Sequence, residues 1–223
     1  MMDPKELIAR RVALELRDRT LVNLGIGLPT MVARYVPAGI TVAFQSENGI
    51  IGFGAPPPHG MEDPHLTDAG GGFISALPGA VSFDSGTSFA LIRGGHLDMT
   101  VLGGLEVDAS GRLANWMVPG KLVPGMGGAM DLVSGAKRVI VAMQHAARGV
   151  PKIVPELSLP PTAVRRVSLV VTEMAVIRPT EAGLELIERA PGVSVDAILA
   201  ATGAKLLVNA DVPEMAIAGA GAA

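Results

Sequence analysis

A single glutamate, Glu47, stands where a carboxylate could do chemistry. It follows residues 40–45, whose β-branched and aromatic side chains predict a strand, and it precedes Asn48-Gly49, a pair that permits a sharp turn. A carboxylate at the end of a strand lies at the carboxyl edge of the sheet, where open α/β folds bind their ligands. The turn would also leave backbone N–H groups free to face a ligand. Taken alone, however, the pattern fits an ordinary turn with an exposed glutamate.

A Gly-X-Gly turn at Gly25 and Gly27 lies between a predicted strand and a predicted helix. Dinucleotide-binding loops have this pattern, and Glu47 follows at about the distance of 20 residues expected of their ribose-binding acid. The third glycine of that motif is replaced by Thr30, and Glu47 lies in a polar turn rather than at a plain strand end. A structural turn is therefore favoured over a nicotinamide site.

A second glycine pair, Gly127-Gly128, precedes another predicted helix. Backbone N–H groups in such a place can bind an oxyanion or a phosphate. Lys121 lies a few residues earlier, but the segment is not a Walker A loop, because no glycine lies five residues before Gly120 and no Ser or Thr follows the lysine. A structural turn and a functional loop fit this segment equally well.

The composition excludes several classes of function. A net charge of −3 and an aromatic content of 3% argue against nucleic-acid binding. The chain has no cysteine, which removes disulfides, thiol nucleophiles and iron–sulfur clusters, and its four histidines lack metal-ligand spacing. No signal peptide and no apolar run of membrane-spanning length is expected, so a cytoplasmic protein without a metal is predicted.

The elements that must position these residues alternate between strands and helices from the start of the chain. This alternation predicts an α/β fold with an open, largely parallel sheet flanked by helices. One domain is expected over residues 1–210, followed by an Ala/Gly-rich tail at 211–223 that is expected to be disordered. Strands are predicted at 20–24, 40–45, 73–76, 99–102, 139–143, 169–172 and 175–178, helices at 3–19, 29–36, 85–92 and 195–202, and an irregular excursion at 52–72.

Taken together, these segments resemble the β subunit of the 3-oxoacid CoA-transferases, the family of succinyl-CoA:3-ketoacid CoA-transferases. The most specific part is Gln45-Ser46-Glu47-Asn48-Gly49, which matches the active-site signature of that family. The resemblance runs from about residue 7 to residue 203. Its other blocks, in the order of the family, lie at residues 23–29, 92–96, 113–121, 125–132 and 190–193.

The resemblance implies a CoA-transferase fold of the sugar-phosphate-isomerase-like type and a catalytic nucleophile at Glu47. It implies ping-pong transfer of CoA between two carboxylic acids through a glutamyl-CoA thioester, with succinyl-CoA and acetoacetate as the expected pair. Coenzyme A would enter only as a substrate thioester, with no cofactor bound permanently. The implied partner is a separate α subunit, in an α2β2 assembly. Residues implied to bind the oxyanion or CoA are Asn23, Gly25, Gly27, Asn48, Gly49, Lys121, Gly127 and Gly128.

Two departures from the family pattern concern the substrate. Many relatives have a lysine where this chain has Gly71, and their Leu-Pro-Leu-Thr-Gly block ends here in Ala163. Three alternatives stay open at this point: an acyl-CoA hydrolase of the same fold, an NAD(P)-binding oxidoreductase and a non-catalytic partner subunit.

Overall fold

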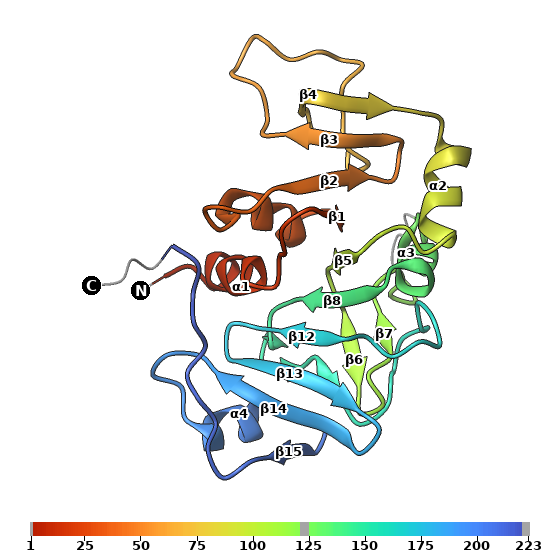
Figure 1. Cartoon of the computed structure of the whole chain (residues 1–223). Coiled ribbons are helices and arrows are strands. Elements are labelled where there is room, and N and C mark those ends of the chain that lie inside the picture. Colours follow the sequence, from red (N-terminus) through yellow and green to blue (C-terminus); the bar gives the residue numbers. More distant parts are fainter. Residues whose placement is uncertain (1, 121–124, 220–223) are drawn as a thin grey trace.

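The computed structural model describes residues 2–120 and 125–219, in which ten strands form one sheet (Figure 1). Their order across the sheet is β15-β14-β13-β12-β8-β5-β1-β2-β3-β4. The bounds of these strands are β1 Thr20–Leu24, β2 Val42–Ser46, β3 Ile50–Gly54, β4 Ser75–Ser82, β5 Met99–Leu102, β8 Arg138–Ala142, β12 Leu169–Val171, β13 Ala175–Thr180, β14 Gly183–Arg189 and β15 Leu206–Val208.

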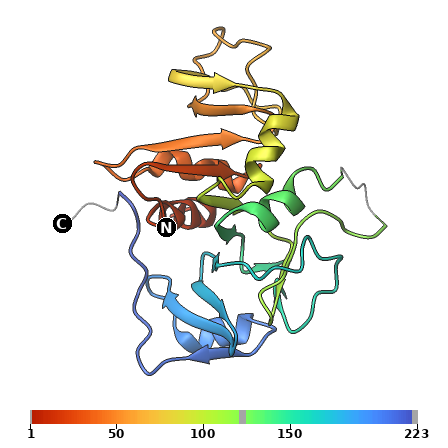
Figure 2. The same ribbon diagram turned by 45° about the vertical axis from the view of Figure 1, so that its right-hand side comes forward.

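The centre of the sheet is parallel and both of its flanks are antiparallel. Strands β2, β1, β5, β8 and β12 pair in parallel, as predicted for an α/β fold. Beyond β2 the chain turns back through β3 and β4, and beyond β12 it turns back through β13 and β14, with β15 parallel to β14. Figure 2 shows the two antiparallel flanks at opposite ends of the parallel centre.

Short helices and small strand groups cover the sheet. No helix in the described parts of the chain is long and apolar enough to cross a membrane. The helices are α1 Pro4–Ala13, the 3-10 helix η1 Leu28–Tyr35, α2 Ser85–Arg93, α3 Ala129–Gly135 and α4 Val195–Ala201. The remaining strands are β6 Glu106–Asp108, β7 Leu113–Ala114 and β11 Ile153–Val154, which form one small sheet, and β9 Ala146–Ala147 and β10 Val150–Pro151, which form another.

Helix α1 begins where the sequence predicts and ends earlier. The Asp3 carboxylate accepts hydrogen bonds from the N–H groups of Lys5 and Glu6, and a proline follows at the first helical position, which together make a strong helix start. The predicted end near residue 19 is wrong. After Ala13 the chain tightens into i→i−3 bonds, the last of them from the Leu16 N–H, and this turn brings the chain to β1.

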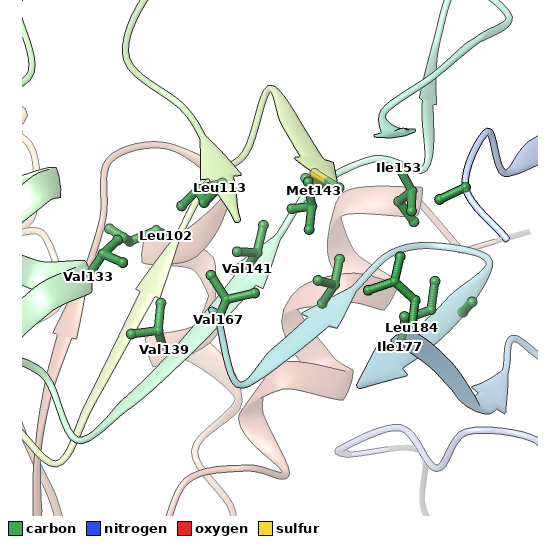
Figure 3. Packing of buried hydrophobic residues seen from close by; sticks show 14 of the residues in the cluster. Leu102, Leu113, Val133, Val139, Val141, Met143, Ile153, Val167, Ile177 and Leu184 are labelled. Carbon is green, nitrogen blue, oxygen red and sulfur yellow. The ribbon is translucent and has the colours of Figure 1, made fainter. Parts of the chain in front are cut away.

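Alternating side chains of the parallel strands build two cores, one on each face of the sheet. On one face Met99, Val101, Ile140 and Ala142 pack with α1 and η1. On the other face the intervening residues pack with α2, α3, α4 and the small β6–β7–β11 sheet, as Figure 3 shows for Leu102, Leu113, Val133, Val139, Val141, Met143, Ile153, Val167, Ile177 and Leu184. Both faces are covered, so the middle strands are apolar on both sides.

The sequence predicts none of the strands β3, β14 and β15 of the large sheet, nor the short strands β6, β7, β9, β10 and β11. The two longest of these unpredicted strands are β3 and β14. Glycine residues hide the strand pattern in both places: Gly52 has a φ of 85° at an irregular point of the β3–β4 pairing, and Gly183 has a φ of 131° at the start of β14. The predicted excursion therefore begins only after Gly54, and β4 extends the predicted strand at 73–76 to residue 82.

The tail differs from the expectation of disorder as far as residue 219. Within residues 211–219 the side chains of Val212, Met215 and Ala218 are buried in the two cores. The Met215 N–H donates to the Arg189 carbonyl and the Ala218 N–H donates to the Arg10 carbonyl. Apolar side chains at three-residue spacing therefore attach this segment to β14 and to α1, so the ordered domain continues past residue 210.

Candidate active site

Glu47 lies in the short turn that joins β2 to β3 at the carboxyl edge of the parallel strands. The turn requires a glycine at its third position. Gly49 has a φ of 122°, and a Cβ atom on it would lie 2.0 Å from the carbonyl oxygen of Phe83. The close approach of the two segments allows a second contact, in which the Phe83 N–H donates a hydrogen bond to the Gly49 carbonyl oxygen at 2.9 Å. The turn is thereby tied to the chain that leads from β4 into α2.

The carboxylate of Glu47 faces the glycine pair that precedes α3. Its Oε1 atom accepts a hydrogen bond from the Gly128 N–H at 3.1 Å, between residues 81 positions apart in the chain. A Cβ atom on Gly128 would lie 2.9 Å from both the carboxyl carbon and Oε1, so any side chain there would displace the carboxylate. Gly127, with a φ of 54°, turns the backbone so that its neighbour can approach. Both glycines named from the sequence therefore lie at the Glu47 carboxylate.

The surroundings favour the neutral form of Glu47. Burial raises the pKa of its carboxyl group above the ordinary 4.5, the hydrogen bond from Gly128 opposes this shift, and the negative charge of Asp131 adds to it. Asp131 is held in place by Arg93, whose Nε donates to its Oδ1 at 2.7 Å. A carboxylate with a raised pKa is more basic, and therefore a better nucleophile, than a solvated one.

Glu47 lines a cavity of about 500 Å³ at the ends of β1 and β5. Among the lining residues that the structure describes, Glu47 is the only one with a charged side chain. The lining residues are Gly25, Ile26, Glu47, Ala69, Leu102, Gly103, Gly104, Leu105, Asn115, Trp116, Gly125, Met126, Gly127, Gly128, Ala129 and Leu132. A larger cavity of about 620 Å³ lies elsewhere, between the β6–β7 and β13–β14 turns, and it includes neither Glu47 nor the glycine pair.

Asn23 lies beneath the cavity and does not line it. Its side chain is 1% exposed, and its Nδ2 donates to both the backbone oxygen and the side-chain Oε1 of Gln45. Thr100 donates to the Asn23 Oδ1, and the Gln45 Nε2 donates to the Ser88 hydroxyl. These four residues, which we call the polar cluster, join β1, β2, β5 and α2 directly below the Glu47 turn. The expectation that Asn23 lines the site is therefore wrong, because Gln45 and Thr100 occupy its hydrogen-bonding capacity.

The other residues named from the sequence are divided between the cavity and its supports. Gly25 lines the cavity, and a Cβ atom on it would lie 3.1 Å from the Val101 carbonyl oxygen. Gly27 is exposed, and with a φ of 84° it begins η1 rather than facing the cavity. Asn48 points to the long loop, where its Nδ2 donates to the Thr67 carbonyl at 2.7 Å. Lys121 lies outside the described residues.

The long loop between β3 and β4 reaches the cavity through Ala69, whose N–H donates to the Ser46 hydroxyl at 2.9 Å. The loop is held by Asp68, which accepts hydrogen bonds from the N–H groups of Gly70 and Gly72. Gly71, where the family resemblance leads one to expect a lysine, has a φ of 79° within this turn. The substitution of glycine therefore suits the local backbone of a loop that borders the cavity.

The sequence interpretation missed the wall of the cavity that follows β5 and β7. No role in the site was predicted for Gly103, Gly104, Asn115 or Trp116, all of which line it. A signal was present, because Gly103-Gly104 directly follows a predicted strand of the parallel centre. The reasoning that placed Glu47 at the carboxyl edge of the sheet applies equally to that position.

Comparisons with known proteins agree with this geometry. Residues 5–201 match the family described as coenzyme A transferase. The beta chain of the acetate CoA-transferase of Escherichia coli K12 is 54% identical over 94% of this chain and 96% of its own length. The B chain of the succinyl-CoA:3-ketoacid coenzyme A transferase of Helicobacter pylori J99 is 49% identical over 92% of this chain and 99% of its own length.

Among solved structures, the acyl-CoA transferase YdiF of Escherichia coli O157:H7 superimposes with a TM-score of 0.77 at 25% identity. The match covers 96% of this chain and 43% of the YdiF chain, so this chain spans a little under half of that protein. The acetate CoA-transferase chain and the Helicobacter pylori chain, in contrast, are covered almost completely and are named as beta and B subunits. This chain therefore belongs to the coenzyme A transferase family, as a subunit of the beta type.

Proposed function

We propose that this subunit transfers CoA between two carboxylic acids through a covalent intermediate on Glu47. The observation that supports the proposal is a half-buried carboxylate with a raised pKa, which borders a cavity of about 500 Å³ and accepts a hydrogen bond from one backbone N–H. The enzyme nucleophile is then the same chemical group as the two acids that are exchanged. A carboxylate can replace either acid on CoA at little cost in free energy, because the bond formed resembles the bond broken.

The reaction begins when a Glu47 oxygen attacks the carbonyl carbon of the acyl-CoA. The C–S bond breaks, and the products are a mixed anhydride of Glu47 and the CoA thiolate. The thiolate then attacks the carboxyl carbon of Glu47, which releases the first acid as a carboxylate and leaves a glutamyl-CoA thioester. The second acid reverses both steps. No proton or electron is gained or lost overall, and the division into steps predicts ping-pong kinetics.

The Gly128 N–H has a specific part in the second step. When the thiolate attacks Glu47, negative charge develops on the oxygen of the Glu47 carboxyl carbon. In the resting site that N–H donates to Oε1 at 3.1 Å, so it already points at the atom that would become the oxyanion. A well-placed donor of this kind contributes about 3–4 kcal/mol to the stability of the transition state. We assign it that role.

Substrates and partner form the finer part of the proposal. Coenzyme A enters and leaves as a thioester, and no permanently bound cofactor is needed by these steps. The names of the relatives point to acetate in one case and to succinyl-CoA and a 3-keto acid in the other. We propose acetoacetate as the 3-oxo acid, with acetyl-CoA and succinyl-CoA as the donors to compare. A separate α subunit would complete the enzyme, in an α2β2 assembly.

The decisive experiment traps the intermediate. The chain, combined with its α subunit, is mixed with acetyl-CoA or succinyl-CoA without acceptor, and the Glu47 peptide is examined by mass spectrometry. The expected product is CoA joined to Glu47 with the loss of water, and acetoacetate should remove it. The control is Glu47→Gln, which keeps the shape of the side chain and should give no adduct.

Three outcomes would contradict the proposal. Full activity in Glu47→Gln would exclude the covalent route. Rapid loss of the thioester to water without acceptor would favour an acyl-CoA hydrolase. Tight binding of NAD(P) without any adduct on Glu47 would favour an oxidoreductase.

A further inference from the structure

Gly103 and Gly104 directly follow β5, and only one of these two positions requires a glycine. A Cβ atom on Gly104 would lie 2.8 Å from the Met143 sulfur and 2.9 Å from the Val141 Cγ1, so packing behind the cavity wall excludes a side chain there. A Cβ atom on Gly103 would meet no atom within 4 Å among the described residues. The φ of Gly103 also lies outside the left-handed region. Neither packing nor backbone conformation therefore requires glycine at position 103.

The empty space beside Gly103 belongs to the cavity that contains Glu47. Gly103 lines that cavity and follows the last residue of β5. Its carbonyl oxygen accepts a hydrogen bond from the Asn115 Nδ2 at 3.2 Å. The Oδ1 of Asn115 in turn accepts from the hydroxyl of Thr162, which is buried. The wall is thus held in place by bonded groups, so a side chain added at position 103 would extend into the cavity instead of turning the wall aside.

The order of the strands sets the width of the space. Strand β2, which ends one residue before Glu47, is separated from β5 by β1 alone. Neighbouring strands lie about 4.8 Å apart, so the ends of β2 and β5 are about 10 Å apart. Van der Waals contact takes about 3.5 Å at each side, which leaves room for only a short acyl chain beyond the reacting carbonyl carbon.

We infer that Gly103 determines which acyl groups this enzyme accepts, because its missing side chain leaves the space in which the acyl chain of the thioester lies. The inference rests on the proposed reaction at Glu47 and adds the class of substrate, which is a short, unbranched acyl group. Bulk at position 103 should then shorten the longest acyl chain accepted. The first stage of the reaction with the shortest thioester should be affected least.

The test uses the enzyme assembled with its α subunit and three thioesters, acetyl-CoA, butyryl-CoA and hexanoyl-CoA. The rate of adduct formation on Glu47 is measured for each. The unchanged enzyme should react with hexanoyl-CoA at least about tenfold more slowly than with butyryl-CoA, since a mismatch of one methylene in a pocket costs about 10–200-fold. Gly103→Ala should lower the butyryl-CoA rate by about tenfold or more and change the acetyl-CoA rate less than about twofold.

Gly86→Ala is the matched control. Gly86 is an exposed residue of α2, and a Cβ atom there would meet only the end of the Asp84 side chain within 4 Å among the described residues. This variant should leave the ratio of butyryl-CoA to acetyl-CoA rates unchanged. Thermal unfolding of both variants shows whether the exchange of glycine for alanine has altered the fold.

Several outcomes would overturn the inference without affecting the proposed reaction. An equal loss with all three thioesters in Gly103→Ala would place the pantetheine arm of CoA, not the acyl chain, beside position 103. An unchanged ratio in a folded Gly103→Ala variant would mean that the space is not used. If Gly103→Ala does not fold, the unchanged enzyme still tests the inference. Equal rates of adduct formation with hexanoyl-CoA and acetyl-CoA would be sufficient to reject the inference. The absence of a Glu47 adduct with any thioester would instead contradict the proposed function.

Discussion

Two titratable side chains, the half-buried Glu47 and the fully buried His145, show what separates a reactive site from a structural one. Burial pushes both toward their neutral forms: the pKa of Glu47 is raised, and the pKa of His145 is lowered from 6.5 to about 4. The difference lies in their partners. Both ring nitrogens of His145 are bonded, Nδ1 to the Thr172 hydroxyl and Nε2 to the Thr202 hydroxyl, each at 2.9 Å. Glu47 accepts one bond and faces a cavity.

A shifted pKa therefore does not by itself identify a reactive site. His145 is 0% exposed and lies in the chain that follows β8. Its ring bonds to the end of β12 and to the end of α4, so its lowered pKa reflects only how completely the ring is buried. Glu47 combines the shift with unfilled hydrogen-bonding capacity and with space for a substrate. Reactivity requires all three features together. Substitutions at the two positions should therefore affect different quantities.

The largest effect is expected on activity at Glu47. Glu47→Gln should lower the rate of CoA transfer by about 10⁴-fold or more, since removal of a covalent nucleophile has effects of that order. The free energy of unfolding at pH 7 should stay the same or rise slightly, because the variant no longer buries a charge. Steady-state transfer assays and urea denaturation measure the two quantities. A large loss of stability in this variant would mean that Glu47, like His145, has a structural role.

Gly128→Ala should have the next largest effect on activity. The added Cβ would lie 2.9 Å from the Glu47 carboxyl carbon, so the carboxylate must move away from the N–H that holds it. A loss of about 10²–10³-fold in the transfer rate is expected, comparable to the removal of an oxyanion donor. Gly86→Ala serves again as the control and should retain full activity. Normal activity in Gly128→Ala would mean that the contact is not used in the reaction.

At His145 the expected effect is on stability. His145→Ala removes a buried ring and one hydrogen bond from each of two threonine hydroxyls, and it should lower the free energy of unfolding by about 3 kcal/mol. Thr202→Val, which keeps the volume and removes one hydroxyl partner of the ring, should lower it by about 1–3 kcal/mol. Both variants should form the Glu47 adduct at the normal rate per folded molecule. A specific loss of adduct formation would give His145 a catalytic role.

The pH dependence of stability should follow His145 with a predictable sign. The pKa of its ring is about 4 in the folded chain, against an ordinary value of 6.5, so the unfolded chain binds the proton more readily. Stability from this group is present above about pH 6.5 and is lost as the pH falls toward 4, with about 2–3 kcal/mol lost by pH 4.5. Glu47 has the opposite sign, because its raised pKa stabilises the fold at low pH. Denaturation at pH 7 and pH 4.5, with His145→Ala as the reference, separates the two.

The smallest predicted effect concerns Asp131. Its charge contributes to the raised pKa of Glu47, so Asp131→Asn should lower that pKa and move the acid limb of the rate of adduct formation to lower pH. The measurement is the pH profile of adduct formation under single-turnover conditions. Asp196→Asn, an exposed change in α4, is the control. A shift to higher pH would contradict the assigned role of this charge.

Local features were predictable from the sequence where neighbouring residues decide them. The start of α1 depends on Asp3 and the proline after it, and the turn at Glu47 depends on the glycine two residues later. The sequence interpretation failed where the decisive contacts are distant. Asn23 was expected to line the cavity, yet its hydrogen bonds to Gln45 and Thr100 hold its side chain below the residues that line the cavity.

The tail illustrates the same limit at a larger scale. Alanine and glycine at 216–223 suggested disorder, but burial of Met215 and Ala218 against the core holds the segment as far as residue 219. Whether a small apolar side chain is buried depends on what surface it meets. Composition alone cannot supply that information.

Residue types and spacing were enough to predict the signature around Glu47, the parallel centre of the sheet and, through the family resemblance, the transfer of CoA. The contact between Gly128 and Glu47, 81 residues apart, and the open space beside Gly103 but not Gly104, exist only in the folded chain. The physical reason is that turns and helix starts depend on bonds between near neighbours in the chain. Desolvation, close approach and empty volume depend on strands that meet only when the sheet has formed.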